Sequence, residues 1–290
     1  MTRVEPGAAT LAERFEAQRP RLVRLAYGQL GSLAEAEDVV QDAWLRLERV
    51  DAGEIRDLGG WLTTTVSRLA LDTLRSARVR REAYVGPWLP EPIVSEPGPA
   101  ERAAQAEKVG LALLVVLESL SASERVAFVL HDVFGYAFDE VASALGTSSA
   151  AARQHASRAR RAVEARRPRF PATPSQQREV VEAFEHAVGE GDVEELLQIL
   201  DPDVVFTSDG GGVVSAARKP LAGAERVARV VLALAAKGAV RQEPVDVNGL
   251  RGSLVVGYDG VPTVFSFTVD AGRIVAIDVQ RNPAKLRGLP

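Results

Sequence analysis

The pattern of apolar and polar positions changes character twice along the chain. Residues 10–82 and 101–167 repeat apolar residues at helical spacing, with few Gly or Pro inside the repeats, which predicts all-helical domains. After Ser175 one amphipathic helix is expected over 176–190 and a shorter one over 192–200. Alternation and β-branched residues then predict strands at Val204–Thr207, Val213–Ala216, Val240–Val247, Ser253–Tyr258, Thr263–Val269 and Arg273–Gln280. The expected fold class is multidomain, with two all-α domains followed by an α+β domain.

Two proline-bearing segments separate these parts. Residues 85–100 hold five prolines and predict an extended linker. A second joint runs from Arg167 to Pro174. We therefore expect a helical domain at 10–84, a proline-rich linker at 85–104, a second helical domain at 105–167 and an α+β domain at 175–290.

Residues 138–167 predict a helix-turn-helix. In the first helix Val141, Ala142 and Leu145 fall on one face, and Gly146 supplies the bend because glycine tolerates left-handed backbone angles. Ser148 or Ser149 can cap the second helix. In this motif the second helix lies in the DNA major groove with its N-terminal residues toward the base edges.

The second helix carries a concentrated positive charge. Residues 149–167 hold six arginines against one acid, Glu164, in a chain of formal net charge −4. A solvated surface helix would show the same charge, but the turn pattern just upstream favours DNA binding. Arg153 is nearest the helix start and is the first candidate for base contact, whereas Arg166 is expected to touch only backbone or nothing. The expected DNA-binding residues of this helix are Ser149, Arg153, Gln154, Ser157, Arg158 and Arg161.

A helix over 34–49 has two distinct faces. Its buried stripe is formed by Val39, Val40, Ala43, Trp44 and Leu47. A second face combines acids, an amide and a leucine, at Asp38, Gln41, Asp42 and Leu45. This second face is either a protein-docking surface or a solvated face with one stray apolar residue.

The next helix begins near Gly60 and combines hydroxyls with arginines. Its inward residues are expected to be Trp61, Leu62, Val66, Leu69, Ala70 and Leu74. Left for solvent or ligand are Thr63, Thr64, Thr65, Ser67, Arg68, Arg75, Arg78, Arg80 and Arg81. Such donors suit phosphates and exposed bases. The DNA-binding residues expected here are Trp61, Thr64, Arg68, Arg75 and Arg78.

Composition narrows the functional classes. The chain has no cysteine, which excludes disulfides, thiol redox sensing and cysteine-ligated zinc, and its three histidines are scattered. The N-terminus shows no signal pattern, and the most apolar run, Leu111–Leu117, is far shorter than the roughly 20 residues that span a bilayer. We expect a soluble, cytoplasmic protein with no cofactor, metal site or membrane partner.

Three segments, in order, resemble the sigma-70 family in its extracytoplasmic-function group. AEDVVQDAWLRL resembles sigma region 2.2, by which the family docks the coiled coil of the RNA polymerase β′ subunit. GGWLTTTVSRLALDTLRSARVRRE resembles the segment that melts and reads the promoter −10 element. LESLSASERVAFVLHDVFGYAFDEVASALGTSSAAARQHASRARRAV resembles region 4, which reads the −35 element. The resemblance covers about residues 10–167. It implies a sigma factor, not an enzyme, with polymerase core (β′ coiled coil, β flap) and promoter DNA as partners.

The remainder resembles a SnoaL-like domain, the cone-shaped α+β fold of polyketide cyclases, which one subgroup of these sigma factors carries at its C-terminus. Three motifs mark that subgroup, and they stand here as Trp88-Leu89-Pro90-Glu91-Pro92, Asp209-Gly210-Gly211-Gly212 and Asn282-Pro283-Ala284-Lys285-Leu286. The glycine motif of the family usually continues with lysine or arginine. Here Val213 follows, and the nearest base is Arg218.

The C-terminal domain admits three interpretations: a cyclase-like enzyme, a small-molecule sensor, or a regulatory module that contacts the sigma domains. The acid–base candidates are Asp209, His186 and Asp278. His186 lies in a polar helix, where a solvated role is expected, and three glycines after Asp209 suit a tight loop better than a rigid general base. Regulation through domain contact is favoured, and a ligand remains open. The expected contact residues are Trp88, Leu89, Pro90, Glu91, Pro92, Asp209, Gly210, Gly211, Gly212, Asn282, Pro283, Lys285 and Leu286. For the linker, the alternative is a passive spacer. For the whole chain, the alternative is a helix-turn-helix regulator whose C-terminal domain is a small-molecule sensor or a cyclase-like enzyme.

Overall fold

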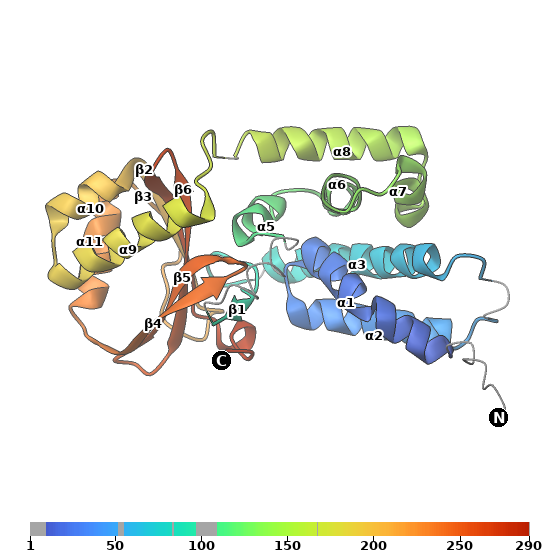
Figure 1. The fold of residues 1–290 in the computed structure, drawn as a ribbon, viewed down its shortest axis with the longest axis horizontal. Helices are drawn as coiled ribbons and strands as arrows, with labels where there is room; N and C mark the ends of the chain where they lie inside the picture. Colours follow the sequence, from blue (N-terminus) through green and yellow to red (C-terminus); the bar gives the residue numbers. More distant parts are fainter. Residues whose placement is uncertain (1–9, 52–54, 83, 97–108, 167, 290) are drawn as a thin grey trace, which may run out of the picture. The chain divides into compact units, whose positions relative to one another are not determined.

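The computed structural model describes residues 10–51, 55–82, 84–96, 109–166 and 168–289 (Figure 1). The chain divides into two compact units. One, the helical unit, comprises 1–78 and 119–162, and the other, the sheet unit, comprises 79–118 and 163–290. Helices precede a mixed α+β part, so the fold class expected from the sequence is confirmed.

The helical unit is built from helices that bury their apolar stripes against one another. Its elements are α1 (Leu11–Leu30), α2 (Leu33–Leu47), most of α3 (Leu58–Glu82), α6 (Ala122–Phe128), the π-helical segment η2 (Val129–Val133), α7 (Phe138–Leu145) and α8 (Ser149–Glu164). Thr10 and Glu13 form a capping box that starts α1, and Gly31 ends it with φ 70°. Trp44 of α2 packs on Phe15 of α1, with ring centroids 4.9 Å apart.

The sheet unit contains one seven-stranded sheet in the order β1-β4-β5-β6-β7-β2-β3. Neighbouring strands are antiparallel except β2 and β7, which are parallel. Its elements are β1 (Val94–Ser95), α5 (Leu111–Leu117), α9 (Pro174–Glu190), α10 (Val193–Ile199), β2 (Leu200–Asp209), β3 (Leu221–Ala222), α11 (Ala224–Ala235), β4 (Ala239–Val247), β5 (Leu250–Gly257), β6 (Pro262–Asp270), β7 (Arg273–Gln280) and the 3₁₀ turn η3 (Pro283–Lys285). Residues of α9, α10 and α11 share a buried apolar core with β2, β6 and β7.

Several elements differ from the sequence prediction. Val213–Ala216, predicted as a strand, is a turn, and the Val213 side chain is 78% exposed. The prediction was wrong because the amides of Val213 and Val214 both bond the carbonyl of Gly210, which reverses the chain instead of extending it. The sequence pattern also missed α11, β3 and the short β1, a strand formed by the linker itself.

Candidate DNA, polymerase and linker surfaces

The predicted docking face of α2, which combines acids, an amide and a leucine, is exposed to solvent in the helical unit. Asp38, Gln41 and Asp42 are exposed, and the Leu45 side chain is 42% exposed, while the opposite stripe of this helix is buried. An apolar side chain ringed by carboxylates and an amide is suited to a basic protein partner. The docking role of this face stays a prediction.

The helix-turn-helix is formed by α7 and α8. Gly146 ends α7 with φ 64°, and the Ser148 hydroxyl accepts a hydrogen bond from the Ala151 amide at 3.2 Å, so Ser148 is the capping residue. The inner face of α8 consists of small residues at helical spacing, Ala152, Ala156, Ala159 and Val163, which are buried. This packing turns the polar face of α8 outward.

All four arginines of α8 are exposed, and three of them contact other side chains. Arg153 lies 5.2 Å from the centroid of the Phe138 ring, an arrangement that orients its guanidinium. Arg158 pairs with Glu124 at 3.7 Å, and Arg160 pairs with Asp132 at 2.6 Å. Gln154, Ser157 and Arg161 are exposed, whereas the half-buried Ser149 donates its hydroxyl hydrogen to Asp139.

The α3 surface is more enclosed than its sequence suggests. Thr63 and Ser67, expected to face solvent or ligand, are buried. Ser67 accepts from the Gln29 amide at 3.1 Å, so the expectation was wrong because a buried hydrogen-bond partner satisfies this hydroxyl. Trp61 and Thr64 are half-buried, and Arg68 and Arg75 are exposed. The side chains of Arg78, Arg80 and Arg81 lie outside the described residues.

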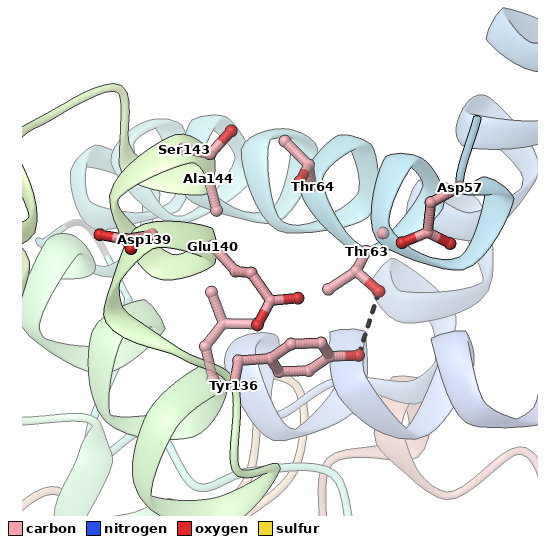
Figure 2. A pocket seen from close by; sticks show the side chains of 10 residues that line it. Asp57, Thr63, Thr64, Tyr136, Asp139, Glu140, Ser143 and Ala144 are labelled. Atoms are coloured by element: carbon pink, nitrogen blue, oxygen red, sulfur yellow. Dashed lines mark hydrogen bonds between the residues drawn. The ribbon is translucent and has the colours of Figure 1, made fainter. Parts of the chain in front are cut away.

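A cavity of about 330 Å³ lies where α7 and the preceding turn face α3. Figure 2 shows the side chains that line it. Tyr136 and Thr63 share a hydrogen bond of 3.1 Å across it, and Glu140 points into it (Figure 2). Arg68 donates from Nη2 to the carbonyl of Ser143 at 2.8 Å. Helix α3, which carries one of the predicted DNA surfaces, therefore contacts α7, the first helix of the helix-turn-helix, and the turn before it.

In the sheet unit, the Asp209 carboxylate holds the linker. This side chain lies at the end of β2 and is fully buried. Its Oδ1 accepts from Tyr84 Oη at 2.6 Å and from the Gly211 amide at 2.9 Å, and its Oδ2 accepts from the Leu89 amide at 3.0 Å and from Lys285 Nζ at 2.7 Å. Burial, followed by the hydrogen bond to Asp209, raises the pKa of Tyr84, so this hydroxyl stays protonated as a donor.

Lys285 connects the carboxylate to the linker. Its Nζ donates to the Leu89 carbonyl at 2.6 Å and lies 3.9 Å from the centroid of the Trp88 ring. Gln280 also reaches the linker, because its amide donates to the Pro90 carbonyl at 3.3 Å. Leu89, Pro90 and Pro92 are buried, and Trp88 and Glu91 are half-buried. We call Tyr84–Pro92, Asp209–Gly212 and Gln280–Leu286 together the linker-binding site.

The remaining motif residues shape this site. Asn282 donates to Tyr84 Oη at 2.9 Å, and its Oδ1 caps η3 by accepting from the Ala284 amide at 3.0 Å. A Cβ on Gly211, whose φ is +66°, would lie 2.5 Å from the Asn282 side chain, so only glycine fits there. Leu286 is buried, and Pro283 is exposed.

Asn248 is a contact residue that the sequence reasoning missed. It begins an Asn-Gly turn between β4 and β5 with φ 49°. Its Oδ1 accepts from the Ile93 amide at 3.0 Å, and its Nδ2 donates to the Val109 carbonyl at 3.1 Å. Both sides of the linker are thereby tied to one residue. The Asn-Gly pair was the available signal for the turn, but nothing local marks its side chain as a linker contact.

The acid–base candidates do not converge. His186 is exposed on α9, and Asp209 is engaged by the linker. Burial raises the pKa of Asp278 to about 7, but Asp278 is not among the residues that line a cavity of about 280 Å³ in the sheet unit. Among the described residues, no cluster of His, Cys, Asp or Glu has the arrangement of a metal site. Likewise, no described helix is long and apolar enough to cross a membrane.

Comparison with known proteins places this architecture in a family. Residues 14–80 match the model of sigma-70 region 2, and residues 110–163 match that of sigma-70 region 4. The chain is 43% identical to the ECF RNA polymerase sigma factor SigJ of Mycobacterium tuberculosis, over 95% of this chain and 93% of that protein. It is 37% identical to the probable ECF sigma factor SigI of the same species, over 94% and 93%. The crystal structure of SigJ superposes with a TM-score of 0.79 at 40% identity, covering 96% of this chain and 99% of that one.

The ordered region 2 and region 4 matches, with relatives aligned over nearly the whole length, confirm the resemblance drawn from the sequence. RNA polymerase and promoter DNA follow as partners of such a protein. The chain belongs to the extracytoplasmic-function sigma factors of the sigma-70 family, the proteins that direct RNA polymerase to promoters.

Proposed function

We propose that this sigma factor is controlled by its own C-terminal domain, which holds the linker between the two promoter-binding regions. The observation that carries the proposal is the buried Asp209 carboxylate, which binds the Leu89 amide while Lys285 binds the Leu89 carbonyl. Buried polar groups are costly unless they are paired. Because the linker supplies the partners, this segment is fixed in one conformation, as a passive spacer would not be.

Binding of the linker by the C-terminal domain limits how far the two promoter-binding regions can separate. An extended chain spans at most about 3.3–3.6 Å per residue, so a free linker would permit many separations. Fixing Tyr84–Ser95 on the sheet unit, and tying Ile93 and Val109 to Asn248, removes most of that reach. A bias of about 1.4 kcal/mol between held and released forms changes a rare population roughly tenfold.

The surfaces assigned from the sequence complete the proposal. The Asp38/Gln41/Asp42/Leu45 face docks the β′ coiled coil, region 4 contacts the β flap, α3 captures the −10 element, and α8 reads the −35 element from Arg153 onward. Since Ser143 of α7 and Tyr136 in the turn before it contact α3, engaging DNA through that side of α3 requires these regions to part. The protein acts in the cytoplasm and catalyses no reaction of its own, which the scattered positions of the acid–base candidates support.

Run-off transcription tests the proposal. Full-length protein with core polymerase is assayed on a promoter selected by the holoenzyme, comparing wild type, Asp209→Asn and the exposed control Asp203→Asn. We expect Asp209→Asn to change transcript yield at least about tenfold at unchanged affinity for core, and the direction of the change tells whether the held linker is the inactive or the active form. Equal yields from all three proteins would refute control by the linker-binding site.

A further inference from the structure

The sheet unit encloses a second feature that the sigma function leaves unused, a cavity of about 280 Å³ between the sheet and helices α9 and α11. This volume approaches the roughly 300–1,000 Å³ of small-molecule pockets and far exceeds the space for one water. Its apolar lining includes Phe184, Phe206, Val231, Phe265, Phe267 and Val279. A small ligand that is mainly apolar would fit such a lining.

The charged residues of the lining indicate what the polar end of a ligand would be. Glu185 is neutralised by Arg251, whose Nη2 lies 2.6 Å from the carboxylate. Arg281 pairs with Asp259 at 2.6 Å, which leaves the Lys237 ammonium as an excess positive charge in the lining. The guanidinium of Arg281 has five N–H donors, and its hydrogen bonds go to Thr263, Ser215 and Asp259. Cationic donors beside an apolar space are complementary to a carboxylate.

We propose that this cavity binds a small, mainly apolar carboxylic acid whose carboxylate contacts Arg281 and Lys237, and that binding loosens the linker-binding site. The consequence of the second half for transcription rests on the proposed function, because loosening the linker-binding site changes transcription only if that site controls it. The proposed site and its ligand class depend only on the cavity and its lining.

The coupling follows from strand geometry. Successive side chains of a strand point to opposite faces of the sheet. On β2, Ser208 lines the cavity and Asp209 holds the linker. On β7, which pairs with β2, Val279 lines the cavity and Gln280 binds the linker. The two sites are opposite faces of the same pair of strands.

Arg281 is the residue through which a ligand would act. It stands between Gln280 and Asn282, which both contact the linker, and its own amide donates to the Asp209 carbonyl at 2.8 Å. Its Nη1 also holds the Ser215 carbonyl at 2.5 Å, in the loop that begins at Asp209. A carboxylate that competes for this guanidinium would displace Ser215 and Asp259, and the loop and tail that grip the linker would move with Arg281.

Binding is tested on the full-length protein with 4-phenylbutyrate, hexanoate and the neutral analogue 4-phenylbutan-1-ol, by ligand-observed NMR and calorimetry. We expect at least one acid to bind at millimolar concentration or below, and 4-phenylbutan-1-ol to bind at least about tenfold more weakly than 4-phenylbutyrate. Val255→Phe fills the cavity and should abolish binding, while Val193→Phe on the exposed side of α10 should not. Binding of neither acid, equal binding of the acid and the alcohol, or binding unaffected by Val255→Phe would overturn the site or its ligand class.

Coupling is read from amide hydrogen exchange of the segment around Leu89, whose amide donates to Asp209. Saturating acid should speed this exchange at least about fivefold in wild type and leave it unchanged in Val255→Phe. Binding without faster exchange would overturn the coupling. If exchange responds but transcription of Asp209→Asn equals that of wild type, the ligand site stands and the proposed function fails.

Discussion

Replacing Lys285 by methionine removes the cation of the linker-binding site while keeping most of its volume. The change deletes the donors to Asp209 at 2.7 Å and to the Leu89 carbonyl at 2.6 Å, together with the ammonium 3.9 Å from the Trp88 ring. It also leaves the buried Asp209 carboxylate without the cation that faces it in the sheet unit. The matched control is Lys219→Met, because that lysine is exposed.

The expected magnitude follows from these contacts. A hydrogen bond to a charged group contributes about 1.5–3 kcal/mol, and a partly desolvated cation–π contact about 0.5–2 kcal/mol. Contributions within one network do not add, and Asp209 keeps donors from Tyr84, Leu89 and Gly211. We therefore expect about 2–4 kcal/mol, which shifts the balance between held and released linker by roughly 30- to 1,000-fold.

Hydrogen exchange of the Leu89 amide measures this balance, because the amide exchanges only when the linker opens locally. Lys285→Met should speed exchange at least about 30-fold, with the unfolding midpoint of the helical unit unchanged, and Lys219→Met should behave as wild type. Exchange within about threefold of wild type in Lys285→Met would show that the linker is held by other contacts, and the energetic argument would be refuted.

Three further predictions test other surfaces. Changing Asp38 and Asp42 to arginine should abolish binding to core polymerase in a pull-down while circular dichroism shows an intact fold; retained binding would contradict the assignment of the docking face. Arg153→Ala should cost about 1–3 kcal/mol of promoter affinity and relax preference at one −35 position, whereas Arg166→Ala should weaken all sequences alike or do nothing; intact preference in Arg153→Ala would place the reading surface elsewhere on α8. Burial raises the pKa of Asp278 to about 7, so the folded domain binds this proton more tightly than the unfolded chain, and stability should fall by up to a few kcal/mol as the pH rises from about 4 to about 7. Asp278→Asn should remove that fall in urea unfolding at pH 5 and pH 8, and an undiminished fall in the variant would assign it to another group.

The sequence by itself determined the local features of this protein. The bend at Gly146 and the small-residue stripe on α8 depend on neighbours along the chain, so they can be read from spacing. The same holds for the two-faced α2 and for most strands of the sheet. The family resemblance rests on such contiguous segments, and the matches at 14–80 and 110–163 confirm it.

Only the tertiary structure decided what the polar residues contact. Asp209 meets the Leu89 amide 120 positions away and the Lys285 ammonium 76 positions away, and no local pattern encodes either pairing. Thr63, expected to face solvent or ligand, is instead buried and bonded to Tyr136, 73 positions further on. Periodicity predicts which face of an element is buried, but the groups that satisfy a buried carboxylate or hydroxyl come from whatever segment the fold brings there.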